Sequence, residues 1–487
     1  MMLRRCAPDP GGNAAGWAGQ GNRQGTGRVQ APCGGDWAPA ARLGVFATAV
    51  MALVTGPAGA QSLPTGTLTL TDAVEAALRS HPAAEGARAR REGAGARLEQ
   101  ARAARLPSFG VEGTLARFQE PMVVAPLHGF DPLDPPEFDR TLLQGNLSLG
   151  YTLFDGGGRS ARIRRAEAGE AGARAGEEWA TMELAYEVSE AYLAVLTAKE
   201  MLEASSRQRE ALEAERQRVE QFLAEGKAAR VDLLRVEAAL SRTEAGEISS
   251  RTELDVALGR LARLTGLSGE EVRTAELVPL RLSSSGELGL GIALDMARSR
   301  SPLLSRAREE VAASAAGVRE AEAAWFPRLE AAARYSDYGT LTGGHTLEWQ
   351  GSLRVSYPLF TGGARGAETQ RAKAEARVAR ESLRLAELQV EESVEMALAG
   401  VKEARGLREA LEAAVGQSAE VARIEALALE AGAGVQTDFL RAEAELLQAR
   451  AGLARARHGE ILARVRLAVA VGELSLDWLK AYLEVAR

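Results

Sequence analysis

The chain has 487 residues, a formal net charge of −7 and an aromatic content of only 5%. No basic stripe appears along it, which excludes the electrostatic footprint of a nucleic-acid-binding protein. Alanine, glutamate, arginine and leucine dominate, and this composition favours long helices and coiled coils over compact mixed folds.

The first 60 residues read as a leader. An apolar run after Arg42 ends in Ala-Gly-Ala at residues 58–60, which is typical of a secretory signal peptide that is cleaved after residue 60. A transmembrane anchor is the weaker interpretation, because the run is short and contains Gly-Pro before its end. Both cysteines, Cys6 and Cys33, precede the cleavage position. We therefore expect no disulfide or thiolate metal site in the mature chain.

The rest of the chain contains an internal duplication. Residues 151–157 (Tyr-Thr-Leu-Phe-Asp-Gly-Gly) recur as residues 357–363 (Tyr-Pro-Leu-Phe-Thr-Gly-Gly). Gly226 with residues 231–235 (Val-Asp-Leu-Leu-Arg) recurs as Gly432 with residues 437–441 (Thr-Asp-Phe-Leu-Arg). The offset is 206 residues in both cases (357 minus 151, and 432 minus 226). A shared offset across that distance indicates two copies of one supersecondary unit.

These observations predict five segments along the chain. They are a leader with signal peptide that is removed (1–60), a first structural repeat (61–267), an inter-repeat linker in an equatorial region around the helices (268–289), a second structural repeat (290–474) and a C-terminal tail (475–487).

Each repeat is expected to begin with a short helix and a longer one, punctuated by prolines. The expected ranges are 72–80 and 83–105 in the first repeat, and 291–298 and 303–324 in the second. The matching prolines are 220 residues apart, so the first repeat carries 14 extra residues (220 minus 206) before Tyr151. This insertion is rich in Pro, Asp and Gly, and we expect it to be a surface loop.

Strands with a period of two follow the short helices. In the first repeat apolar residues alternate with polar ones from Leu143 to Leu153, and in the second from Leu347 to Leu359. Weaker strands are expected before them, at residues 109–115 and 329–335. Each repeat thus offers one β-hairpin with one apolar face and one polar face.

A half-buried sheet in a soluble domain is the ordinary interpretation of such alternation. The flanking helices, however, carry little apolar surface with which to cover a sheet. Strands of this length, apolar outside and polar inside, suit a membrane β-barrel. On that interpretation four aromatic residues form a girdle at the lower interface: Tyr151, Phe154, Tyr357 and Phe360.

A helix of about 100 Å is expected after each Gly-Gly pair, because residues 160–224 contain no proline. Its sparse apolar residues form a narrow stripe, which is typical of a coiled-coil seam and not of a globular core face. The stripe residues are Leu184, Val188, Tyr192 and Val195 in the first copy, and Val390, Val394, Leu398 and Val401 in the second. Returning helices are expected at residues 231–264 and 437–471.

These features resemble the TolC-type family of outer-membrane efflux proteins, the outer membrane factors of tripartite efflux and type I secretion. The match covers roughly residues 65–474. Two duplicated motifs carry it: a Gly-x₅-Asp helix turn, and the Tyr-x-Leu-Phe-x-Gly-Gly transition from strand to helix, with Phe154, Gly156, Gly157, Phe360, Gly362 and Gly363.

The resemblance implies a mostly α fold with a membrane β-barrel. The long helices would form an α-helical coiled-coil barrel, and two β-hairpins per chain would contribute to a 12-stranded barrel shared by three chains. Four strands alone cannot close a barrel and would leave edges exposed to lipid.

The function that the resemblance implies is a passive channel, not an enzyme, with no cofactor. It would lie in the outer membrane and extend into the periplasm as a homotrimer. Its partners would be a periplasmic adaptor (membrane fusion) protein, an inner-membrane pump and outer-membrane lipid, with no nucleic acid. The alternative is a soluble periplasmic coiled-coil adaptor or scaffold, against which the apolar hairpin faces argue.

By the same resemblance the helix turns form the periplasmic entrance. Asp438 matches a carboxylate that forms a constriction ring in the best-known member, which has a second carboxylate at the position of Arg441 and a basic residue at that of Gly434. Gate candidates are Asp438, Arg441, Asp232 and Arg235. Each Asp lies three residues before its Arg, so a surface ion pair is an equal interpretation. Candidates for adaptor binding are Gly226, Lys227, Arg230, Val231, Gly432, Gly434, Val435 and Thr437.

No catalytic constellation competes with this interpretation. His81, His128, His345 and His458 are scattered without metal-ligand spacing, and His458 is expected on a polar helix face. The Gly-Gly motifs lack the Lys and Ser/Thr of a phosphate-binding loop. We therefore expect no catalytic residue and no metal site.

Overall fold

The computed structural model describes residues 66–128, 132–133, 135–283, 288–341 and 343–485. The chain divides into one unit of residues 1–60 and a second of residues 61–487. The predicted leader, its cleavage position and both cysteines lie outside the described residues. The second unit contains both repeats.

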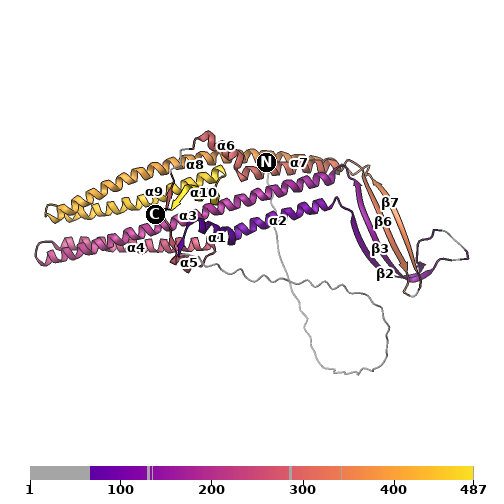
Figure 1. The fold of residues 1–487 in the computed structure, drawn as a ribbon, viewed down its shortest axis with the longest axis horizontal. Helices are drawn as coiled ribbons and strands as arrows, with labels where there is room; N and C mark the ends of the chain where they lie inside the picture. Colours follow the sequence, from indigo (N-terminus) through magenta and orange to yellow (C-terminus); the bar gives the residue numbers. More distant parts are fainter. Residues whose placement is uncertain (1–65, 129–131, 134, 284–287, 342, 486–487) are drawn as a thin grey trace, which may run out of the picture. The chain divides into compact units, whose positions relative to one another are not determined.

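The two repeats contain matching elements (Figure 1). The first consists of α1 (Leu70–Ser80), α2 (Pro82–Ala103), β2 (Ser108–Val123), β3 (Phe138–Phe154), α3 (Gly158–Ala224) and α4 (Arg230–Thr265). The second consists of α6 (Leu290–Arg300), α7 (Pro302–Ala323), β6 (Arg328–Gly339), β7 (His345–Ser356), α8 (Ala364–Glu430) and α9 (Gln436–Val471). Both α3 and α8 have 67 residues, and both α4 and α9 have 36. The two halves of the second unit thus contain the same six elements in the same order.

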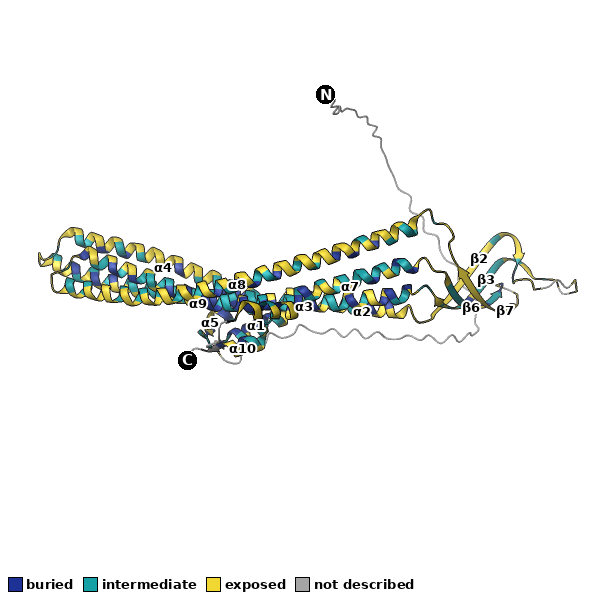
Figure 2. Cartoon of the chain, turned by 90° about the horizontal axis from the view of Figure 1, so that it is seen from above, coloured by how far each residue is buried: buried dark blue, intermediate teal, exposed yellow. Residues whose placement is uncertain are grey.

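The long helices lie side by side (Figures 1 and 2). In the half next to the strands the packing order is α2, α3, α7 and α8, and in the half next to the helix turns it is α4, α3, α9 and α8. Among the helices that the structure describes, only α3 and α8 therefore run through both halves. One side of this layer ends in α8, and the other ends in α2 and α4.

The shorter helices meet end to end halfway along α3 and α8. Ser80 Oγ, at the end of α1, donates a hydrogen bond to the Thr265 carbonyl at the end of α4 (3.1 Å). Gly472 ends α9 with a φ of +79°, and a Cβ there would lie 2.8 Å from the Arg300 carbonyl carbon. Glycine is needed at this junction because a side chain fits neither the backbone conformation nor the space.

The main apolar core lies halfway along α3 and α8, where the shorter helices meet (Figure 2). The predicted stripe of Leu184, Val188, Tyr192 and Val195 is buried, but it packs against α1 and against short elements of the linker and tail. These are α5 (Gly269–Thr274), β4 (Glu276–Leu277) and α10 (Leu476–Tyr482). The prediction of a coiled-coil seam in place of a globular core was wrong here, because the short elements supply additional apolar partners.

The linker and the C-terminal tail are joined by small sheets. β1 (Thr67–Leu68) pairs in parallel with β4, and β5 (Leu280–Leu282) pairs antiparallel with β8 (Leu483–Val485). The buried Tyr192 hydroxyl accepts a hydrogen bond from the Val278 N–H (2.8 Å). It lies 2.8 Å from the Leu68 carbonyl oxygen, to which it donates its own proton. Burial raises the pKa of Tyr192.

Four antiparallel strands form one open sheet in the order β2-β3-β6-β7. Leu147 stands opposite Val111 on one side and Tyr335 on the other, so apolar residues of neighbouring strands share a face as predicted. β7 ends at Ser356, before the predicted end at Leu359. The reason is Pro358, which has no N–H to donate to a strand partner.

The insertion of the first repeat is only partly a loop. β2 and β3 have 16 and 17 residues, whereas β6 and β7 have 12 each. The segment between β2 and β3 runs over residues 124–137, against 340–344 between β6 and β7. The extra residues therefore lengthen the strands as well as the connection, which corrects the prediction of a surface loop alone.

Candidate functional site

One face of the four-stranded sheet is apolar and exposed. Val111 is 80% exposed and Trp349 is 78% exposed, and no described helix covers this face. Its other large members come from all four strands: Phe109, Leu115, Leu143, Leu147, Leu149, Tyr151, Tyr335, Leu347, Leu353 and Val355. So large an exposed apolar surface marks a contact with protein or membrane.

The opposite face of the sheet is polar. The Ser336 hydroxyl donates a hydrogen bond to Asn146 Oδ1 (2.8 Å), and Gln144 Nε2 donates to the same atom (3.1 Å). Charged side chains of Glu112, Arg334, Glu348 and Arg354 stand on this face by the strand register. The sheet thus separates an apolar surface from a polar one, and the outer edges of β2 and β7 pair with no described strand.

The aromatic residues of the strand-to-helix motifs lie at the end of the sheet nearest the helices (Figure 1). Tyr151, Phe154, Tyr357 and Phe360 are all exposed. The glycines that follow turn the chain from strand to helix: Gly156, Gly157, Gly362 and Gly363 have φ values between +60° and +86°. A Cβ on Gly156 would lie only 2.7 Å from the Ala323 carbonyl oxygen, so the end of α7 packs directly onto this turn.

The helix turns at the far end are two copies of one glycine turn. Gly226 and Gly432 have φ values of +73° and +70°. The next residue donates a backbone hydrogen bond five residues back, Lys227 to Phe222 (2.7 Å) and Ala433 to Ala428 (2.9 Å). This is the Schellman pattern, which satisfies the last carbonyls of a helix.

The predicted adaptor-binding residues crowd around these two turns. Val231 and Val435 are 48% and 56% exposed, and Gly226, Lys227, Arg230, Gly432 and Thr437 are exposed as well. A Cβ on Gly434 would lie 2.9 Å from the Leu429 backbone nitrogen. A side chain at this position would therefore clash with the backbone at the end of α8.

The two Asp–Arg pairs of the turns differ. Asp232 Oδ1 lies 3.2 Å from Arg235 Nη1, and Asp232 Oδ2 accepts a hydrogen bond from the Ala229 N–H (3.3 Å). Asp438 and Arg441 are both exposed, and within the described part of the chain neither forms an ion pair. The structure brings the first pair together and leaves the second pair apart.

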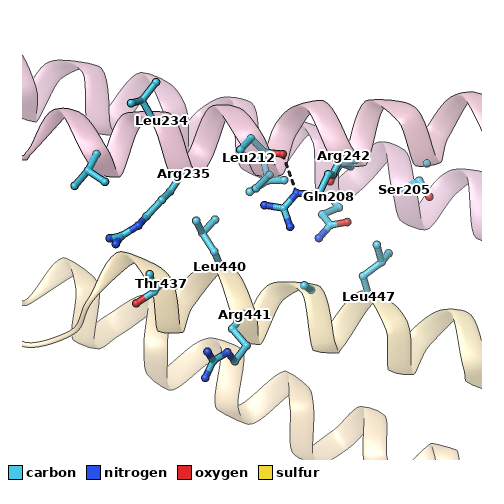
Figure 3. A pocket seen from close by; sticks show the side chains of 16 residues that line it. Ser205, Gln208, Leu212, Leu234, Arg235, Arg242, Thr437, Leu440, Arg441 and Leu447 are labelled. Carbon is cyan, nitrogen blue, oxygen red and sulfur yellow. Dashed lines mark hydrogen bonds between the residues drawn. The ribbon is translucent and has the colours of Figure 1, made fainter.

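A groove lies beside the turns, between α3, α4 and α9 (Figure 3). It has a volume of about 670 Å³, and Leu212, Leu234, Leu440 and Leu447 form its apolar lining. Three guanidinium groups line it as well: Arg235, Arg242 and Arg441. The sequence analysis did not predict this groove. Leu234 was the available signal, because it is a large apolar residue that is 53% exposed on the polar surface of its helix.

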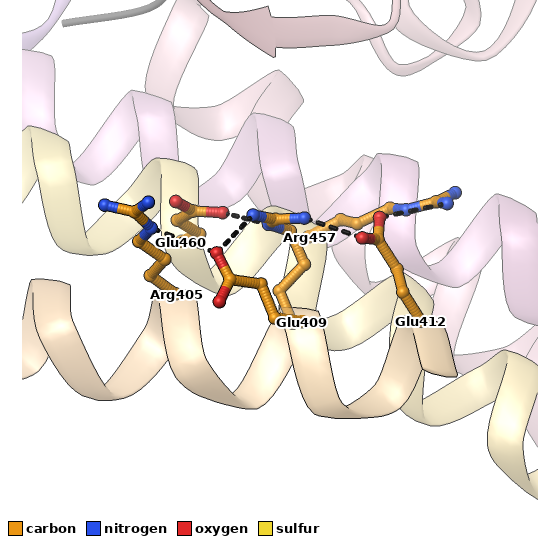
Figure 4. Close-up of polar contacts among 6 residues, drawn as sticks. Arg405, Glu409, Glu412, Arg457 and Glu460 are labelled. Atoms are coloured by element: carbon orange, nitrogen blue, oxygen red, sulfur yellow. Dashed lines mark hydrogen bonds and ion pairs between the residues drawn. The ribbon is translucent and has the colours of Figure 1, made fainter. Parts of the chain in front are cut away.

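A hydrogen bond joins the two helical hairpins, and ion pairs lie within each of them. Glu215 of α3 is buried, accepts a hydrogen bond from Gln436 Nε2 of α9 (2.8 Å) and pairs with Arg218 (2.6 Å). Between α8 and α9, Arg408 pairs with Glu460 at 2.5 Å. These carboxylates raise the pKa of their arginine partners, so the arginines stay charged. Figure 4 shows Glu460 beside Arg457 and Glu412, which also form an ion pair (3.6 Å).

The histidines are dispersed, as predicted. His81 Nδ1 accepts a hydrogen bond from the Ala83 N–H at the start of α2 (3.3 Å). His458 is only 7% exposed, which corrects the expectation of a polar helix face. Its Nδ1 lies 2.8 Å from Thr197 Oγ1 on α3, and burial lowers its pKa to about 4. The described residues contain no group of three or more potential ligands that could hold a metal ion.

Comparison with known proteins identifies the family. The model of a family described as "Outer membrane efflux protein" matches residues 73–267 and 293–473, which is more than half of the chain. The chain belongs to the outer membrane efflux protein family. This family consists of outer-membrane proteins and not of enzymes, so the predicted resemblance and localisation are confirmed. It does not favour the soluble adaptor alternative. No helix within the described ranges is long and apolar enough to cross a membrane.

Two curated relatives share part of the sequence. Protein CyaE of Bordetella pertussis is 27% identical over 274 residues, which is 54% of this chain and 56% of CyaE. Alkaline protease secretion protein AprF of Pseudomonas aeruginosa is 27% identical over 203 residues, covering 39% of this chain and 41% of AprF. The chain thus matches about half of the length of these relatives.

Solved structures share the fold. The outer membrane protein VceC of Vibrio cholerae aligns with a TM-score of 0.71 and 20% identity, over 83% of this chain and 96% of VceC. The CmeC outer membrane channel of Campylobacter jejuni aligns with a TM-score of 0.73 and 17% identity, over 85% and 88%. The mostly helical fold with a small sheet is thereby confirmed.

Proposed function

We propose that this chain is the outer-membrane duct of a tripartite efflux or type I secretion system. It passively exports what a periplasmic adaptor and an inner-membrane pump deliver. One observation carries the proposal: the sheet exposes a continuous apolar face at the end of helices whose own surfaces are charged. Such a face is stable in lipid, whereas its polar reverse suits a water-filled lumen.

The sheet requires further copies of the chain to close. Its outer strands leave backbone N–H and C=O groups unpaired among the described residues, and such groups are costly in hydrocarbon. Pairing β7 of one copy with β2 of the next satisfies both edges. Three copies of four strands give twelve, an even number within the range of known barrels. We therefore infer the homotrimer that the family resemblance implies, with its helices forming a tunnel across the periplasm.

The internal duplication supplies a template for the contact between copies. Arg102 of α2 pairs with Glu167 of α3 (3.5 Å), and the corresponding Glu322 and Lys373 of α7 and α8 pair with the charges exchanged (3.2 Å). The two helix pairs therefore pack in the same way. Within the chain, α3 packs against α7. By the same relation, α8 packs against α2 of a second copy.

This relation predicts contacts residue by residue. Inside the chain, a Cβ on Gly172 of α3 would lie 3.5 Å from the Cβ of Glu309 on α7. The corresponding residues are Val378 on α8 and Ala89 on α2, given offsets of 206 and 220. Both are exposed in the single chain, with Val378 at 66%. We infer that Val378 contacts Ala89 of a second copy.

The helix turns are the proposed entrance and adaptor-docking surface. The exposed Val231 and Val435 and the groove of Figure 3 offer apolar surface beside arginines, which suits an amphipathic helical partner. Asp438 and Arg441 are free to act as gate residues in an assembly. Asp232 and Arg235 already neutralise each other, so we assign them a structural role at the start of α4.

The proposed organisation keeps the predicted boundaries. Residues 1–60 are a removed leader, 61–267 and 290–474 are the repeats, and 268–289 and 475–487 meet in an equatorial region. The relative AprF is named for alkaline protease secretion, and CmeC is described as an outer membrane channel. Both descriptions support export as the function.

Two measurements test the proposal together. Fractionation of cells that express the chain should place it in the outer membrane, and the purified protein should conduct ions when inserted into planar lipid bilayers. A soluble periplasmic protein without conductance would instead support the adaptor alternative and overturn the proposal.

A further inference from the structure

The two strand-to-helix junctions differ in how they neutralise an arginine. In the first junction, Arg159 lies over the ring of Tyr151, with its guanidinium carbon 5.9 Å from the ring centroid. Its Nε lies 3.3 Å from Asp155 Oδ2, and the same carboxylate oxygen accepts the Arg159 backbone N–H (2.8 Å). The first junction thus contains its own counter-charge, and both side chains are largely buried.

The second junction has the same arginine without the carboxylate. Arg365 corresponds to Arg159 at the offset of 206, but Thr361 stands where Asp155 would be. The Arg365 guanidinium carbon lies 4.8 Å from the centroid of the Trp325 ring and 5.5 Å from that of Tyr357. A single long hydrogen bond joins Nη2 to the Leu359 carbonyl (3.4 Å).

The remaining donors of Arg365 are unsatisfied. Its Nε and Nη1 are inaccessible to solvent and have no hydrogen-bond partner among the described residues, nor does any described carboxylate pair with this guanidinium. Aromatic faces attract a cation, but they do not accept its in-plane N–H groups. A partly desolvated guanidinium without a counter-ion is costly, so this junction favours an anion from outside the chain.

The surroundings of Arg365 indicate what kind of anion this is. Tyr357 continues the alternation of Leu353 and Val355, which belong to the apolar sheet face. Leu359 and Phe360 are 86% and 88% exposed beside it. Tryptophan, tyrosine and arginine next to exposed apolar side chains are characteristic of a membrane–water interface, where arginine pairs with lipid phosphates.

We propose that Arg365, Trp325 and Tyr357 bind the phosphate of an anionic phospholipid, whose acyl chains lie along Leu359 and Phe360. The two rings are about half exposed, so rotation of either one opens Nε and Nη1 to the phosphate. The inference rests on the proposed function, because it requires the apolar sheet face to lie in a membrane. A trimer has three such sites, one at each second junction.

The difference between the junctions supplies the test variants. Thr361→Asp gives the second junction the carboxylate that the first junction has. This carboxylate should pair with Arg365 in place of the lipid phosphate. Arg365→Gln removes the charge. Asp155→Thr is the matched control: it removes the carboxylate from the first junction and should create a second lipid-sensitive arginine. Arg159→Gln should leave lipid binding unchanged.

The measurement is the thermal unfolding midpoint of the delipidated assembly in detergent, titrated with short-chain phosphatidylglycerol. Phosphatidylcholine with the same acyl chains and inorganic phosphate serve as comparison ligands. The parent should be stabilised by phosphatidylglycerol alone. Arg365→Gln and Thr361→Asp should weaken that binding about fivefold, since one arginine near a lipid surface contributes about 1 kcal/mol. Asp155→Thr should increase the stabilisation.

Three results would overturn the proposal. Equal stabilisation by phosphatidylglycerol and phosphatidylcholine would show that the site does not recognise the charge of the lipid. Stabilisation by inorganic phosphate equal to that by phosphatidylglycerol would indicate a site for free anions. Loss of the oligomer in Arg365→Gln, with or without lipid, would show that a carboxylate of a second copy is the counter-ion. The proposed function is tested separately, because it fails if the parent itself is a soluble periplasmic protein without conductance.

Discussion

Replacement of Leu147 by arginine tests which face of the sheet meets lipid. Leu147 lies four residues from Tyr151 on the apolar face, about 13 Å along the strand at 3.3 Å per residue. With strands tilted by about 40°, this places it about 10 Å deeper than the aromatic girdle, near the middle of an apolar band about 25 Å tall. An arginine at that depth costs about 2–4 kcal/mol per chain.

The matched control is Gln144→Arg. Gln144 lies on the polar face between Thr114 and Tyr338, where a charge stays hydrated in a lumen, so the cost should remain within about 0.5 kcal/mol. The assay is urea unfolding of the protein in phospholipid vesicles, followed by tryptophan fluorescence. Equal losses for both variants, or a larger loss for Gln144→Arg, would refute the assignment of the faces.

Three further predictions concern the core and the helix turns. Tyr192→Phe should lower the free energy of unfolding by about 1–3 kcal/mol in thermal denaturation, because a buried linker N–H loses its acceptor. Because burial lowers the pKa of His458 to about 4, the unfolded state binds a proton that the folded state rejects, and stability should fall by up to about 3 kcal/mol as the pH drops from about 6.5 towards 4. Glu200, whose pKa burial raises, offsets part of this loss, and His458→Gln should abolish the pH dependence that His458 causes. If Asp438 forms a gate ring, Asp438→Ala should reduce cation preference in single-channel recordings and Arg441→Ala should raise it, whereas unchanged traces for both would leave the turns as docking surface alone.

Periodicity and duplication made most of the long elements predictable. The alternation around Leu147 identified the apolar face because a strand reverses its side chains at every residue. The helices between the prolines and glycines matched to within a few residues, since Pro82, Pro302, Gly226 and Gly432 act through local backbone geometry that needs no tertiary context.

The equatorial region and the details of the site were not predictable in the same way. β1, β4, β5 and β8 have two or three residues each, too few for any period, and they form only because distant segments meet. The sequence pattern also gave Asp232 and Asp438 equivalent roles. The structure separates them, because side-chain pairing depends on neighbours that the repeat does not duplicate.

Disulfide formation between copies is a direct test of whether the chain assembles into a trimeric duct. In a background with Cys6 and Cys33 replaced by serine, the chain has no other cysteine. A variant with Ala89→Cys and Val378→Cys should give cross-linked dimers and trimers in outer membranes under mild oxidation. A variant with Gly172→Cys and Glu309→Cys, positions that face each other on α3 and α7 of one chain, should form an internal disulfide. This disulfide should leave the chain at the apparent molecular mass of a monomer. Cross-linking confined to this internal pair, with Ala89→Cys and Val378→Cys chains remaining monomeric, would contradict the trimeric duct.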